Sequence, residues 1–99
     1  MNTIVIRSAE FCGPEDGIVD SAQRIATAVV DAARDHESVT VSMDRVLGAS
    51  SSFFNVLLSE LVMRLGSEAI GTRIQVTGLT RTQQTIFERS RAAVLRSFS

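Results

Sequence analysis

The sequence has no lysine, and cysteine and proline each occur once. A lone Cys12 cannot form an intrachain disulfide, and no second type of metal ligand lies near it. No apolar run approaches the roughly 18 residues of a membrane-spanning helix. Residues 1–6 lack the basic and long apolar regions of a signal peptide. We therefore expect a cytoplasmic protein with no membrane segment, metal or cofactor.

A concentrated basic surface is also missing. The formal net charge is −1, and charged residues make up 21% of the chain. Residues 1–44 carry eight acids and three arginines, whereas residues 45–99 carry three acids and seven arginines. Phosphate backbones are bound by dense positive charge, so the near-neutral balance argues against a nucleic-acid partner. Arg81, Arg89, Arg91 and Arg96 are best explained as the solvated face of the last helix.

Hydrophobic residues make up 44% of the 99 residues, enough for one core and too few residues for two. We therefore expect a single domain over residues 1–99. A strand followed by a helix recurs three times along it. The expected strands cover residues 3–8, 38–44 and 72–77. The expected helices run from Pro14 to about residue 35, from the serine run at residues 50–52 to Gly66, and onward from a cap at Thr80.

The expected strands alternate between apolar and polar residues. Val39, Val41 and Met43 point one way and Thr40 and Ser42 the other, and in the third strand Ile74 and Val76 point inward, with Arg73 outward. Parallel strands covered on both faces read as continuous apolar runs instead. We therefore predict an α/β fold with a short, mostly parallel sheet and helices mainly on one face. The open face or a sheet edge is a candidate homodimer contact.

The first expected helix has one apolar stripe. Its members recur at helical spacing and are Ile18, Ala22, Ile25, Ala26, Val29 and Ala33. The second expected helix is the most hydrophobic, and we expect it to be the most buried.

Catalytic residues are hard to assign. The only histidine, His36, lies in a polar turn between Asp35 and Glu37, where an exposed loop histidine is far more common than a catalytic base. Cys12 has no activating base near it in sequence. Gly13 and Gly17 flank a helix start without the spacing of a phosphate-binding loop. We therefore predict that the chain is not an enzyme.

The run Ser50-Ser51-Ser52 stands after a strand and loop, where the second helix begins. A serine at this place caps the helix by accepting a hydrogen bond from a backbone N–H group, which explains one of the three serines. Phosphorylation is the functional alternative, since a phosphate is stabilised at a helix N-terminus and changes any surface built around it.

The segment from Val39 to Leu58 resembles the signature of STAS domains. These domains include bacterial anti-sigma factor antagonists and the cytoplasmic tails of sulphate transporters, and their signature is an apolar strand ending in an acid, a short loop, and serines opening an apolar helix. The serines followed by Phe53, Phe54 and Asn55 are more similar still to a STAS-like family of unknown function. The resemblance implies a small strand–helix superhelix.

The resemblance also implies a function. It predicts a bacterial regulatory domain that docks on a protein partner such as an ATP-binding serine kinase or an anti-sigma-like protein, with Ser51 as the candidate phosphorylation site. The family's acid before the serines is Ser50 here, and the glycine after them is Phe53. The candidate docking residues are Asp44, Ser50, Ser51, Ser52, Phe53 and Asn55.

Two other functions fit the same residues. The chain is either a scaffold or oligomerisation module that has no phosphorylation switch, or a small-ligand domain that binds a nucleotide at the helix terminus beside residues 50–52.

Overall fold

The computed structural model describes residues 2–12 and 17–98, in which strands and helices alternate. The elements of the sheet are β1 (Thr3–Arg7), β2 (Ser38–Ser42) and β3 (Ile74–Thr77). The helices are α1 (Ile18–Asp35), α2 (Ser51–Leu65) and α3 (Arg81–Ser97), with short 3-10 helices η1 (Ser8–Phe11) and η2 (Ser67–Ala69). The predicted α/β class with a parallel sheet is confirmed.

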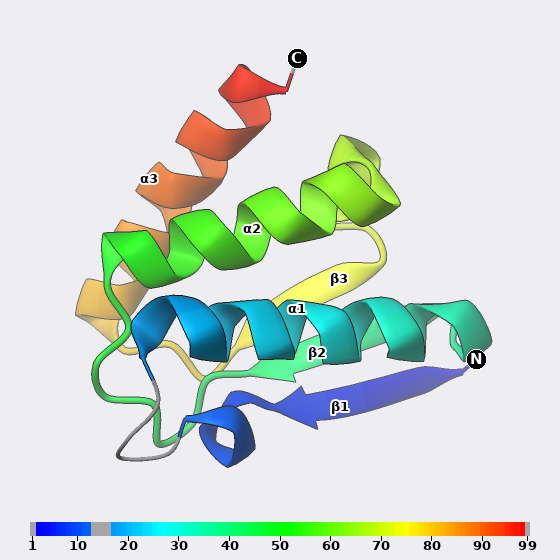
Figure 1. The fold of residues 1–99 in the computed structure, drawn as a ribbon, viewed down its shortest axis with the longest axis horizontal. Coiled ribbons are helices and arrows are strands. Elements are labelled where there is room, and N and C mark those ends of the chain that lie inside the picture. Colours follow the sequence, from blue (N-terminus) through cyan, green and yellow to red (C-terminus); the bar gives the residue numbers. More distant parts are fainter. Residues whose placement is uncertain (1, 13–16, 99) are drawn as a thin grey trace.

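The strands pair in the order β1-β2-β3, and both pairings are parallel. Right-handed connections between strands that follow one another in this order place their helices on the same face of the sheet. Val39, Val41 and Ile74 are buried on that face, whereas Val5 and Gln75 are exposed on the other. Figure 1 shows α1 and α2 layered on the sheet and α3 beside α2. The one-sided arrangement predicted from the alternation is therefore observed.

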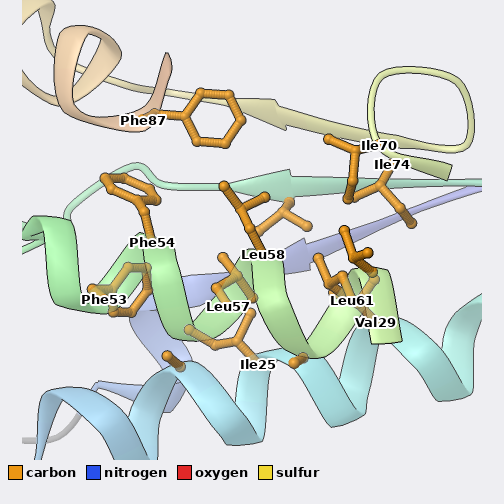
Figure 2. Close-up of a cluster of buried hydrophobic side chains, with 14 of the residues drawn as sticks. Ile25, Val29, Phe53, Phe54, Leu57, Leu58, Leu61, Ile70, Ile74 and Phe87 are labelled. Atoms are coloured by element: carbon orange, nitrogen blue, oxygen red, sulfur yellow. The ribbon is translucent and has the colours of Figure 1, made fainter. Parts of the chain in front are cut away.

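Helix α2 forms the centre of the core. Its residues Phe54, Leu57 and Leu61 are fully buried, and Leu58 is 1% exposed. Figure 2 shows side chains of α2 directed both toward α1 and toward Phe87 of α3. The rings of Phe54 and Phe87 meet edge to face, with centroids 5.5 Å apart, an arrangement that aromatic pairs favour. The prediction that this helix is the most buried is confirmed.

Several strands and helices begin or end at residues other than those expected. β1 ends at Arg7 and β2 at Ser42, and α1 begins at Ile18 after the cap residue Gly17. Pro14 lies outside the described residues. Ile18 is 48% exposed and so does not belong to the buried stripe of α1, whose other expected members are buried. It stands in the first turn, where the sheet no longer lies under the helix.

The expectation that Arg73 belongs to a strand and points outward is wrong. β3 begins one residue later, and the Arg73 guanidinium reaches the C-terminal end of α1. It donates to the carbonyl oxygens of Ala33 and His36, at 2.6 and 3.2 Å, and to that of Glu37 at 3.2 Å. The last carbonyls of a helix have no partners within the helix. Arg73 therefore caps α1 from the far side of β2.

α3 begins with a reciprocal cap. The Thr80 hydroxyl accepts from the backbone N–H of Gln83, and the Gln83 side chain accepts from the backbone N–H of Thr80. This capping box satisfies two free donors of the helix end, and it confirms the cap predicted at Thr80.

The chain turns between β3 and α3 at Gly78, which has a φ of 73°. A Cβ atom placed on Gly78 would lie 2.6 Å from Oδ1 of Asp44 and 2.8 Å from its backbone N. Both the left-handed backbone and the contact with Asp44 therefore require glycine. This close approach joins the end of β2 to the start of α3.

We expect Gly78→Ala to lower the free energy of unfolding by about 2–4 kcal/mol, since the new methyl group meets Asp44 in a strained conformation. Urea denaturation followed by circular dichroism measures the change. Gly48→Ala is the matched control, because a Cβ at Gly48 meets no atom within 4 Å. An equal loss of stability in both variants would contradict the proposed contact.

Candidate functional site

The loop between β2 and α2 is held at both ends and exposed in the middle. Val46 and Ala49 are buried, and Leu47 and Gly48 between them are exposed. The buried Gln83 of α3 donates from Nε2 to the carbonyl oxygen of Val46 at 2.6 Å. The loop is therefore fixed to the core on either side of its tip.

Arg45 begins this loop with a φ of 68°. Left-handed backbone costs a residue with a Cβ atom about 1 kcal/mol or more, and such residues persist where the surrounding structure imposes them. Here the buried Met43 and Val46 on either side fix the turn. The backbone of Arg45 thus directs the chain outward toward Leu47.

Leu47 is the most exposed large hydrophobic residue described, at 92%. It borders a hollow of about 250 Å³, whose lining includes Ile18, Val46 and Phe53. An isolated exposed leucine is common on protein surfaces, but one that borders an apolar hollow is more typical of a contact site. From the sequence, docking is expected through the loop from Arg45 to Ser52, which contains Leu47, but Leu47 itself is not singled out. Its only signal was a leucine next to a glycine in a short loop.

The three serines have different environments. The Ser50 hydroxyl accepts from the backbone N–H of Phe53 at 3.4 Å and so caps α2. Ser50 is half-buried, while Ser51 and Ser52 are exposed in the first turn of the helix. That turn contains no acidic residue. The structure therefore assigns the cap to Ser50 and leaves Ser51 open to solvent at the positive end of the helix dipole.

Three of the six expected docking residues are exposed together at the start of one helix. Ser51, Ser52 and Asn55 are exposed near the start of α2. Phe53 is 2% exposed and packs edge to face on Phe54, with ring centroids 5.4 Å apart. Its side chain is part of the core and also lines the hollow beside Leu47, so a partner would reach Phe53 only through that hollow.

Asp44 is exposed at the end of β2, as part of a local turn. The Ser42 hydroxyl donates to Asp44 Oδ2 at 3.3 Å and accepts from the backbone N–H of Asp44 at 3.4 Å. These hydrogen bonds and the close approach to Gly78 indicate that Asp44 has a structural role. We define the docking surface as Leu47 with Ser51, Ser52 and Asn55.

Of the other candidates, His36 lies apart from this surface and Cys12 lies beside it. His36 follows the end of α1, where Nδ1 is 2.8 Å from the carbonyl oxygen of Ala32. Cys12 is half-buried at the edge of the hollow beside Leu47. Within residues 2–12 and 17–98, no three His, Cys, Asp or Glu side chains gather as a metal site would require. None of the helices in these segments has the length and apolar character needed to cross a bilayer.

Comparison with known protein families gives a match over most of the described chain. The profile of a family described as a STAS-like domain of unknown function matches residues 21–84, from the first turn of α1 to the start of α3. The matched segment includes the whole docking surface. No curated protein and no solved structure matches the chain.

We expect Ser50→Ala to lower the free energy of unfolding by about 1 kcal/mol, because the N–H of Phe53 loses its partner. Ser52→Ala is the control and should change stability by less than about 0.5 kcal/mol, as is usual for exposed positions. Both values come from chemical denaturation. A larger effect at Ser52 than at Ser50 would show that the cap is misassigned.

Proposed function

Because this chain belongs to the family of STAS-like domains of unknown function, we propose that it is a regulatory protein-interaction domain of the cytoplasm. The docking surface binds a protein partner, and a phosphate at Ser51 weakens the binding. The resemblance to anti-sigma factor antagonists suggests an ATP-binding serine kinase or an anti-sigma-like protein as the partner.

The exposure of Leu47 is the observation that carries the proposal. Burial of a leucine side chain stabilises a complex by about 1.5–3 kcal/mol. The loop is already fixed by Gln83 and by its buried flanks, so little conformational entropy is lost when Leu47 is covered. The hollow beside it offers apolar lining for a side chain of the partner. Leu47 thus has the features of an anchor residue in an interface.

Ser51 supports the regulatory part of the proposal. Its hydroxyl lies in the first turn of α2, one residue after the cap, and the residue is exposed. A phosphate there carries a charge of about −1.5 to −2 and is compatible with the folded helix, because the N-terminal N–H groups favour negative charge. The same charge opposes burial under a partner, since it must lose its water. Modification would therefore spare the fold and reduce docking.

The lining of the hollow favours a protein over a nucleotide. Among the described residues that line it, Arg45 alone is charged, and most of the others are apolar. Its volume of about 250 Å³ is below the 300–1,000 Å³ usual for small-molecule sites. A scaffold without a switch remains the main competing function. It differs from the proposal in one respect only, because a scaffold's binding does not depend on the charge at residue 51.

We expect Leu47→Asp to reduce capture of a partner at least tenfold, because the interface loses its apolar anchor and buries a charge. The wild-type and variant chains are each immobilised and incubated with an extract of the cells that produce the protein. The proteins that each chain retains are then compared by mass spectrometry. Met63→Asp is the matched control, since Met63 is 67% exposed on α2, near the end of that helix that is far from Leu47. A partner lost equally from both variants would argue against the docking surface.

We expect phosphate at Ser51 in chain purified from its own cells. Trypsin cleaves after Arg45 and Arg64, so one peptide carries Ser50, Ser51, Ser52 and Ser59, and fragmentation assigns the site. Ser51→Asp should weaken capture of the partner, and Met63→Asp, which adds the same charge near the other end of α2, should leave it unchanged. If Ser51 is never modified and Ser51→Asp binds as the wild type does, the scaffold function replaces the switch.

A further inference from the structure

β1 is an edge strand with an open outer side. The backbone N–H of Ser38 donates to the carbonyl oxygen of Asn2, and Thr3 stands opposite Ser38 in the register. In a parallel ladder, alternate residues direct their N–H and C=O groups to opposite sides of the strand. Asn2, Ile4 and Ile6 therefore face β2, and Thr3, Val5 and Arg7 direct their backbone groups outward. In the described part of the chain, no strand pairs with that side, which forms the lower edge of the sheet in Figure 1.

This edge lacks the usual protection against pairing. Natural edge strands carry prolines, lysines, inward-pointing charges or bulges. β1 consists of Thr3, Ile4, Val5, Ile6 and Arg7, so its only charge is at its end. Val5 at its centre is 54% exposed. We propose that two copies of this chain pair through β1, in antiparallel orientation about a two-fold axis at Val5, and form a continuous six-stranded sheet.

The side chains of β1 are complementary to themselves in this register. Val5 stands opposite Val5 of the second copy, so each covers the other's exposed surface on the open face. Thr3 stands opposite Arg7, which keeps the two arginines apart. On the helix-covered face, Ile4 stands opposite Ile6, and both are only half-buried in the single chain. Apolar cross-strand pairs of this kind stabilise sheets.

The backbone is complementary as well. With Val5 on the axis, the two Val5 residues exchange both of their hydrogen bonds, and so do both Thr3–Arg7 pairs. All outward N–H and C=O groups of Thr3, Val5 and Arg7 thereby gain partners. If the two-fold axis were shifted by one residue, Ile4 or Ile6 would lie on it. The backbone groups of these two residues are already bonded to β2. The register centred on Val5 is therefore favoured over its neighbours.

Helix α1 extends the same interface above the sheet. It runs antiparallel to β1, with Arg24 and Ala28 beside Phe11 at one end and Asp35 next to Asn2 at the other, where Asn2 Nδ2 donates to the Asp35 carbonyl oxygen. α1 connects β1 to β2 and covers both. Strands about 4.8 Å apart would bring the two α1 axes to roughly 10 Å, the spacing of packed helices.

The test is the mass of the full chain in solution, measured by light scattering over a concentration series. The average mass of the wild type should rise with concentration toward that of two chains. Val5→Arg places two charges face to face on the axis and should raise the dimer dissociation constant tenfold or more. Gln75→Arg is the matched control, because Gln75 is exposed on the same face of the sheet but lies on β3. It should dimerise as the wild type does.

A crosslink tests the register. Residues opposite each other in a bonded antiparallel pair have Cα atoms about 5.5 Å apart, within the range of a disulfide. In a Cys12→Ser background, Val5→Cys should oxidise to a covalent dimer, and Gln75→Cys should not. A monomeric wild type at all concentrations would overturn the proposal. A dimer that persists in folded Val5→Arg, as checked by circular dichroism, would overturn it equally.

Discussion

The structure depends on the burial of α2 between its neighbours. Phe54, Leu57, Leu58 and Leu61 fill the space enclosed by α1, the sheet and α3, and Figure 2 shows their side chains extending in more than one direction from the helix. Burial of each large apolar side chain contributes about 1.5–3 kcal/mol. Because α2 is fixed along its length, its first turn and the loop before it are fixed too. The docking surface therefore stands at the start of the helix that forms the centre of the core, and on the loop before it.

Much of the fold could be predicted from the sequence because each strand alternates cleanly. Val39 and Val41 predict one buried face, and Gly66 and Thr80 predict where α2 ends and α3 begins, as observed. Phe53 and Phe54 both belong to the apolar stripe of the second helix, and both are buried as that stripe predicts. The stripe does not show that the ring of Phe54 meets Phe87 of α3, because this contact joins residues far apart in the sequence.

Two other features depend on contacts between distant residues. Arg73 reads as an outward strand residue in an alternating pattern, but its long side chain reaches the end of α1. Gln83 reads as a member of a weak helical stripe, but its amide holds the loop at Val46. Neither contact has a local sequence signal, since each joins residues about 40 positions apart. Leu47 becomes meaningful only when these contacts fix the loop around it.

The cap that Arg73 places on α1 has a consequence for how the chain folds. Three strand–helix units in a row resemble a solenoid, in which each unit contacts only its neighbours and can melt separately. Here the carbonyls that end the first helix find their donor at the start of the third unit. The first helix is thus incomplete until the last strand has docked. Unfolding should accordingly proceed in one all-or-none transition, and fragments that stop before residue 73 should not hold native structure.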